Sequence, residues 1–327
     1  MDNLTHSLAG LMMSRAGIDR KVPKAALLMI VAANLPDIDV VSGLGGALNY
    51  LKWHRSYTHA LAAAPVMAFV PVLFLTILRV RPTLTAYAAS LAGILSHLAL
   101  DWTNVYGIRL LLPFSSVWLR LDQTDVIDPW IWAVLLLAVA APALAKLVGS
   151  EIGAKAGAGP RRGWAWFALI VILGYEGARF AAHSRALAVM GAHVYNGTIA
   201  ERLTAIPDRV NPWRWRGIAE GNGFVAIVPL DLAGEFDPSE GRIEYAPEPN
   251  PAIEIAKKTP AFKGFAAFNQ LPFWKVTPVP GGTRVELIDL RFGTPQNPGF
   301  EARTLVDESG AAHDARVTIG VPVQNGR

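Results

Sequence analysis

The sequence contains no cysteine, which excludes disulfide bonds and cysteine-ligated zinc. Charge is also scarce: charged residues make up 17% of the 327 residues, against about 25% in soluble domains, and 52% are hydrophobic. The N-terminus lacks the basic start and unbroken apolar core of a signal peptide, because Asp2 begins it and His6 and Ser7 interrupt it. We therefore expect a membrane protein, and any metal site in it must use His, Asp, Glu or backbone ligands.

The long apolar runs lie almost entirely in residues 1–182, whereas residues 183–327 carry the Pro, Gly and alternating patterns of a β-rich domain. The sequence thus predicts an all-α polytopic membrane helix bundle followed by an extramembrane β-rich (α+β) domain. About six helical segments are expected, at residues 3–16, 23–35, 57–78, 84–101, 129–148 and 164–182. Strands are expected at 223–232, 284–292 and 314–323, with a short helix at 260–268.

Segment lengths and charges predict how the bundle lies in a membrane. The last four segments approach the ~20 residues that a bilayer core requires, while Pro36 ends the second segment early. Basic residues gather in the loops 15–24, 79–81 and 146–162. The positive-inside rule makes these loops cytoplasmic. We expect a multi-pass protein of the inner (cytoplasmic) membrane with its C-terminal domain on the extracytoplasmic side.

Polar motifs from five separate stretches fall at the opposite, outer end of this predicted bundle, and they include four of the seven histidines. Ionisable groups at membrane depth are costly and tend to be functional. The candidate metal ligands are His6, Asp37, Asp39, His54, His59, His97 and Asp101, with Asp122, Asp125 and Asp128 as further candidates.

The donor types predict a divalent metal site. His97 and Asp101 are four residues apart on a helix, so both reach one ion. Imidazole and carboxylate without thiolate suit Zn²⁺, with Mn²⁺ or Fe²⁺ as alternatives, and one or two ions fit the number of carboxylates. Asp37 or Asp39 is the expected general base if it is not a ligand, and Arg55 would hold a phosphate or a carboxylate. The sequence leaves open whether His54 or His59 binds the metal.

Each motif also has a structural explanation. His6 alone would be an interfacial side chain, the "PDID" stretch a solvated turn, and Ser56 the N-cap of the helix that follows it. His97 and Asp101 could form a hydrogen bond at a helix end, and Asp128 could cap the fifth segment. The coincidence of all these motifs at one end favours the metal site.

The stretches "DNLTHSLAG", "NLPDID", "HRSYTHAL", "HLALDWTNVYGIRLLLPF" and "DVIDPW" resemble the YdjM/YbcI-type membrane-bound metal-dependent hydrolases. This resemblance covers about residues 1–150 and implies a hydrolytic activity. The order of ligands is also similar to that of zinc-dependent phospholipase C and P1-type nucleases, which would make Asp101 a bridge between two zinc ions. Those enzymes add an N-terminal tryptophan amine, a further His and a Glu, which this sequence does not reproduce.

The combined expectation is a membrane-bound phosphoesterase or phospholipase that acts on a lipid or a lipid-linked phosphate. Ester or amide hydrolysis at the same metal is an alternative chemistry. The alternative from another class is a metal-stabilised membrane scaffold that recruits a partner through residues 183–327. A transporter is disfavoured because the ionisable groups gather at one end. Membrane lipid is the expected partner and nucleic acid is not, while the oligomeric state stays open.

Overall fold

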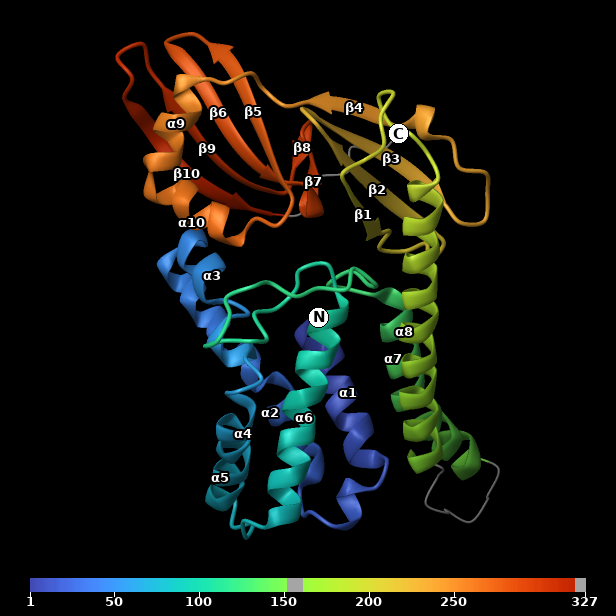
Figure 1. The fold of residues 1–327 in the computed structure, drawn as a ribbon. Coiled ribbons are helices and arrows are strands. Elements are labelled where there is room, and N and C mark those ends of the chain that lie inside the picture. The colour runs from blue at the N-terminus through green and yellow to red at the C-terminus, as the bar shows by residue number, and fades with distance from the viewer. Residues whose placement is uncertain (152–160, 321–327) are drawn as a thin grey trace. The chain divides into compact units, whose positions relative to one another are not determined.

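The computed structural model describes residues 1–151 and 161–320, which form two compact units (Figure 1). Unit 1 comprises Met1–Ile38, Arg55–Arg185 and Pro207–Arg214. Unit 2 comprises Asp39–His54, Ala186–Ile206 and the chain from Trp215 onward. Within the described residues, four helices are long and apolar enough to cross a membrane, or five if one broken pair counts as a single span. The predicted helical part followed by a β-rich part is confirmed.

Unit 1 is built on five main helices that match five of the predicted segments. Their bounds are α1 Asn3–Arg15, α2 Ala25–Asn34, α6 Leu84–Thr103, α7 Pro129–Glu151 and α8 Arg161–Gly191. Side chains cap three of them: Asp2 accepts from the first-turn N–H groups of α1, Thr83 does so for α6, and Asp128 for α7. The cap that the sequence suggested for Asp128 is therefore present.

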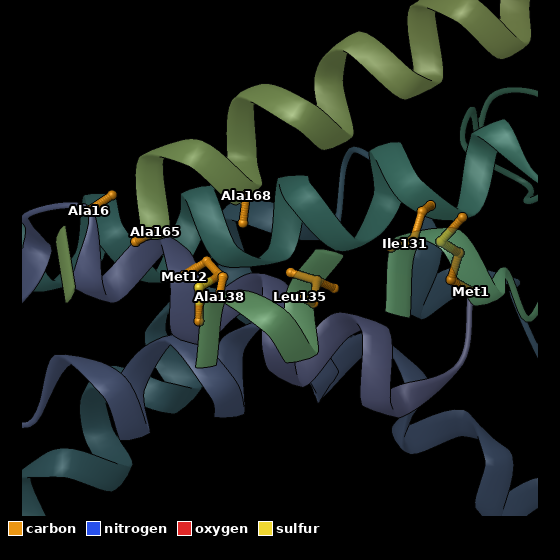
Figure 2. Packing of buried hydrophobic residues seen from close by; sticks show 8 residues of the cluster. All are labelled: Met1, Met12, Ala16, Ile131, Leu135, Ala138, Ala165 and Ala168. Carbon is orange, nitrogen blue, oxygen red and sulfur yellow. The ribbon is translucent and has the colours of Figure 1, made fainter. Parts of the chain in front are cut away.

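A hydrophobic cluster joins α1, α7 and α8 (Figure 2). Met12 of α1 packs with Leu135 and Ala138 of α7 and with Ala165 and Ala168 of α8. The alanines let the helix backbones approach closely, which is how helices associate where lipid removes the hydrophobic driving force between them.

Two glycines bring α2 against its neighbours. A Cβ on Gly10 of α1 would lie 2.6 Å from the carbonyl oxygen of Met29, and a Cβ on Gly93 of α6 would lie 2.9 Å from the Ala32 Cβ. Neither position has room for a side chain. The helix α2 is therefore held between α1 and α6, and these three helices carry or support most of the site described below.

The segment predicted as one helix over 57–78 is broken, and that expectation was wrong. It forms a 3₁₀ turn, η3 (Tyr57–His59), and two short helices, α4 (Ala64–Met67) and α5 (Phe69–Ile77). Proline favours the break, because it has no N–H and fits the first turn of a helix better than its interior. Starting α4 at Ala64 and α5 at Phe69 places Pro65 and Pro71 in first turns, whereas one continuous helix would bury both in its interior.

Ser56, which the sequence suggested as the cap of that helix, precedes η3 and makes no side-chain capping bond. The second segment also differs from expectation. Its α-helix ends at Asn34, as Pro36 requires, but the chain continues as a 3₁₀ helix, η2 (Leu35–Gly45). A further helix that was not predicted, α3 (Ala47–Trp53), follows in unit 2.

The last of the six predicted helical segments, 164–182, is longer than predicted. Its helix, α8, passes through residue 183 and ends at Gly191. The expected boundary at 183 followed a change in composition, and no Pro or Gly stops the helix between His183 and Met190. Part of the basic loop 146–162 and the end of the strand at 314–323 lie outside the described residues.

Unit 2 contains two four-stranded sheets and a small two-stranded sheet. The first sheet has the order β1 (Arg202–Pro207), β2 (Arg214–Gly221), β3 (Phe224–Asp231), β4 (Arg242–Tyr245). The second has the order β10 (Ala312–Ile319), β9 (Phe300–Val306), β6 (Gly282–Asp289), β5 (Pro272–Val279), and its pairs are antiparallel. The strands β7 (Gly293–Thr294) and β8 (Asn297–Pro298) pair with each other.

Two helices pack on the second sheet, α9 (Pro251–Lys258) and α10 (Pro260–Phe268), the latter at the bounds expected from the sequence. The unpredicted helix α3 packs on α10, and a Cβ on Gly264 would lie 2.2 Å from a methyl carbon of Leu48. Glycine at 264 is therefore what allows α3 to pack so close to α10. Segment 39–54, which the sequence placed in the bundle, thus belongs with unit 2.

Candidate metal centre

Four buried side chains of unit 1 present ligand atoms to one small volume: Asp37, His59, His97 and Asp101. Asp37 comes from η2, His59 from η3, and the other two from α6. The pair on α6 confirms the helical spacing argument, since His97 Nε2 lies 3.3 Å from Asp101 Oδ2. Three separate segments therefore supply one group of donors.

The distances between these atoms fit a tetrahedral ion. His59 Nε2 lies 3.0 Å from His97 Nε2, 3.2 Å from Asp101 Oδ2 and 3.4 Å from Asp37 Oδ1. His97 Nε2 lies 3.7 Å from Asp37 Oδ1. With bonds of about 2.0–2.1 Å, the corners of a tetrahedron around zinc are roughly 3.3–3.4 Å apart. The residues present thus fit a zinc-sized divalent ion.

The hydrogen bonds of the imidazoles show which nitrogen atoms are available. His97 Nδ1 lies 2.7 Å from the carbonyl oxygen of Ala33, and because a carbonyl only accepts, Nδ1 carries the proton. The lone pair of neutral His97 is then on Nε2, which faces the other donors. His59 is held in a similar way by the Thr58 hydroxyl, 3.1 Å from its Nδ1. Such outer contacts orient metal-binding histidines.

The second oxygen of Asp101 faces a different set of groups. His6 Nε2 lies 3.4 Å and Arg55 Nη2 3.0 Å from Oδ1, and the Met1 amino group also contacts Oδ1. The His6 ring stacks on His97 with 3.8 Å between ring centroids. Both His6 nitrogens are buried, and neither has a hydrogen-bond partner among the described residues. Asp101 therefore stands between the four-donor group and an imidazole whose nitrogens are unused.

Arg55 is almost completely buried, and its guanidinium turns inward. In addition to Asp101 it donates from Nη1 to Asn104 Oδ1, at 2.9 Å, and it stacks on the ring of Tyr106. The backbone of Arg55 is left-handed, with φ of 57°, which is uncommon for a residue other than glycine. In this structure Arg55 positions Asp101, and its expected contact with a phosphate stays a prediction.

The two histidines of "HRSYTHAL" go to different places. His59 joins the four-donor group, whereas His54 Nδ1 lies 2.7 Å from Asp39 Oδ1 and its ring stacks on Tyr50. Asp39, His54 and Tyr50 all belong to unit 2. His59 is thus the histidine of this stretch that joins the donors of unit 1, and metal binding by His54 stays a prediction.

The three aspartates of the loop before α7 lie apart from the four-donor group and have other partners. Asp122 pairs with Arg120, and Asp125 lies 3.2 Å from Arg209 Nε. Asp128 caps α7 and accepts from the Tyr175 hydroxyl at 2.9 Å. Burial raises the pKa of the Asp128 carboxyl, which these donors partly offset.

Two polar residues near the site were missed from the sequence. Asn104 connects Arg55 to the end of α6, and a lone asparagine after a helix gave no signal of this role. Glu176 of α8 accepts from the Thr103 hydroxyl at 3.3 Å, while its Oε2 is buried without a hydrogen-bond partner among the described residues. A carboxylate inside the predicted segment 164–182 was a signal that could have been read.

Comparisons with known proteins agree with the helical part of the chain. The family model described as "YdjM inner membrane protein" matches residues 1–186. The "Uncharacterized protein YfhP" of Bacillus subtilis (strain 168) is 27% identical over 149 residues, which are 43% of this chain and 46% of that protein. The chain thus covers less than half the length of this relative. No solved structure matches the chain.

Proposed function

We propose that this chain, which by its match over residues 1–186 belongs to the YdjM inner membrane protein family, is a membrane-bound metal-dependent hydrolase. The ion in this proposal is zinc, held by Asp37, His59, His97 and Asp101. A bound divalent ion lowers the pKa of a coordinated water and polarises the oxygen of a substrate. The class of substrate that we propose is a phosphate ester carried by a lipid.

The observation that carries this proposal is the position of His6. A purely structural ion needs only a closed shell of ligands. Here a third imidazole, whose nitrogens make no hydrogen bond among the described residues, lies beside Asp101 in the same buried volume. Such a group can take up a proton during hydrolysis or hold a second ion that shares Asp101. An enzyme would therefore need His6 for its reaction, whereas a structural metal site would not.

The residues around the four donors have distinct roles in the proposed site. The carbonyl of Ala33 and the hydroxyl of Thr58 orient His97 and His59. Arg55 and Asn104 fix Asp101 so that Oδ2 faces the four-donor group and Oδ1 faces His6. Together with two carboxylates, a divalent ion forms a neutral group, which lowers the cost of burying charge at membrane depth.

The position of the donor residues along α6 is the reason for proposing a lipid-linked substrate. His97 and Asp101 are in the last two turns of α6, a helix long and apolar enough to span a bilayer. The ligands then lie near the level of lipid headgroups. With the orientation given by the basic loops, this end of unit 1 faces the extracytoplasmic side of the inner membrane.

The burial of the ligands supports a second candidate, a metal-stabilised membrane scaffold. The side chains of His59, His97 and Asp101 have no exposed surface, and four donors complete a tetrahedral shell. In that case the ion would stabilise the bundle, and unit 2 would bind a partner. Cobalt substitution separates the two candidates, because inorganic phosphate changes the visible spectrum of an open cobalt site and leaves that of a closed one unaltered.

The direct test compares His6→Ala with His97→Ala in purified, zinc-loaded protein. Zinc content is measured by elemental analysis, and hydrolysis with a chromogenic phosphodiester and with phospholipid vesicles. We expect His97→Ala to lose both zinc and activity. His6→Ala should keep one zinc ion and lose activity by about 100-fold or more, as removal of an acid–base group does. Full activity in both variants would exclude the proposed mechanism.

A further inference from the structure

The loop between α6 and α7, residues 104–128, has an apolar tip near its middle, and the proposed function does not involve this tip. The tip, residues 111–117, has the sequence "LLPFSSV" and contains no charged residue. Leu111, Phe114 and Val117 are 45%, 89% and 57% exposed. Exposed apolar side chains that lie together mark a surface that binds a membrane or another protein.

The backbone of the tip is suited to an apolar environment. The N–H groups of Phe114 and Ser115 both donate to the carbonyl oxygen of Leu111, at 3.0 and 3.1 Å. Val117 donates to the Ser115 hydroxyl at 3.4 Å, and Pro113 has no N–H. These bonds lower the cost of bringing the tip to the edge of the lipid, where headgroups and water can pair with its other backbone groups.

The tip is also continuous with the apolar outer side of unit 1. Leu61 donates its N–H to the carbonyl oxygen of Leu110 at 2.9 Å, and Leu110 packs on the cluster that includes Ala64 of α4 and Ala68 between α4 and α5. The short helices that start there expose apolar side chains, such as Val66 at 71% and Leu73 at 59%. In a membrane protein this side faces lipid, and the tip extends it.

We propose that residues 111–117 insert into the lipid at the end of unit 1 that carries the metal centre. The occupant of this surface is the membrane itself, at the boundary between headgroups and acyl chains. Arg109, stacked on Trp118 with 4.8 Å between its guanidinium and the ring, stands at the base of the tip, as basic and aromatic residues do at membrane interfaces.

The insertion has a consequence for the metal centre. The loop continues from the tip to the residues that hold Asp101: Ile108 and Leu119 exchange backbone hydrogen bonds of 2.9 Å, and Arg109 donates to the Arg55 carbonyl oxygen at 3.1 Å. Arg55 in turn binds Asp101. Lipid around the tip thus anchors the loop that positions the carboxylate, whether or not the centre is hydrolytic.

The absence of cysteine makes the test direct, because one introduced thiol is labelled alone. We suggest a nitroxide on Phe114→Cys in vesicles of phosphatidylethanolamine and phosphatidylglycerol. The matched controls are Leu73→Cys on the exposed side of α5 and Glu308→Cys on an exposed turn of unit 2. Accessibility is measured to oxygen, which concentrates in lipid, and to a water-soluble nickel chelate.

We expect the label at 114 to behave as at 73, accessible to oxygen and protected from nickel. Accessibility to nickel equal to that at 308 would place the tip in water and overturn the proposal. Protection from both reagents would show that protein covers the tip and would also overturn it, with spin dilution identifying a second copy of the chain. If Phe114→Cys does not fold, Val117→Cys gives the same readout.

Discussion

The Nε2 atoms of His59 and His97 lie 3.0 Å apart, although 38 residues separate them in the chain. The bond from His97 Nδ1 to Ala33 turns the lone pair of His97 toward His59. Two nitrogens that face each other at this distance need a proton or a cation between them. With Asp37 and Asp101 at the same place, a divalent cation satisfies all four donors at once.

The first prediction separates the two histidines of the 54–59 stretch. His59→Ala should weaken zinc binding strongly, because it removes one of four donors, whereas His54→Ala should keep the tightly bound ion. Zinc affinity measured by competition with a chelator of known affinity gives the comparison. His193→Ala, a histidine of unit 2 bonded to the Val189 carbonyl, controls for loss of any imidazole. The opposite order for His54 and His59 would contradict the assignment.

The second prediction concerns the support of Asp101. Arg55→Lys keeps the positive charge but cannot reach Asp101 and Asn104 with the same planar fork. We expect zinc affinity to fall by roughly 10–100-fold, as for other residues that orient metal ligands. Isothermal titration of the metal-free protein measures it. Arg209→Lys, at the half-exposed pair with Asp125, should leave the affinity unchanged; equal affinities in all three proteins would show that Arg55 does not position the ligand.

The third prediction tests the close approach of α2 and α6. Gly93→Ala places a methyl group 2.9 Å from the Ala32 Cβ, so the helices must separate or distort. Overpacking of this kind costs about 1–3 kcal/mol. Thermal unfolding in detergent should show a lower midpoint. Gly177→Ala on α8 is the matched control, since a Cβ there meets nothing within 4 Å. A Gly93 variant as stable as this control would argue against the packing.

The fourth prediction uses pH. Burial, and secondly the neighbouring Glu286, raise the pKa of the Glu301 carboxyl in β9, and Arg303 opposes them in part. The folded protein therefore holds this proton at a pH where the unfolded chain has released it, so stability falls as pH rises through the raised pKa. Replacing Glu301 by Gln removes this loss.

We expect the melting temperature of Glu301→Gln to exceed that of the wild type near pH 7.5 and the difference to shrink toward pH 4.5. Measuring the two proteins side by side cancels the titration of other groups. Glu308→Gln, on an exposed turn, should show no such difference at either pH. A constant difference between Glu301→Gln and wild type across this range would mean that the Glu301 carboxyl does not titrate as described.

Features that depend on local spacing could be predicted from the sequence. His97 and Asp101 lie on one face of α6 because residues four apart in any α-helix do so, and their ligand atoms meet as expected. The membrane character, the extents of α6 and α10 and the capping role of Asp128 follow equally from short stretches of chain. The absence of cysteine limited the side chains that could bind a metal to His, Asp and Glu.

The choice between neighbouring candidates needed the tertiary structure. Asp37 and Asp39 lie two residues apart in η2, and the division between the two units falls between them. Asp37 therefore meets the histidines of unit 1, and Asp39 pairs with His54. No sequence pattern states that the chain becomes a 3₁₀ helix after Pro36, so the two aspartates looked equivalent.

The sequence by itself determined that this is a membrane protein with His and Asp donors gathered from several segments, because hydropathy and helical spacing are properties of short stretches. The structure decided which donors meet. That outcome depends on where prolines 65 and 71 break the third segment, on the left-handed turn at Arg55, and on glycines that let α2 approach α1 and α6. These are contacts between residues far apart in the chain, and packing fixes them only when the whole unit is folded.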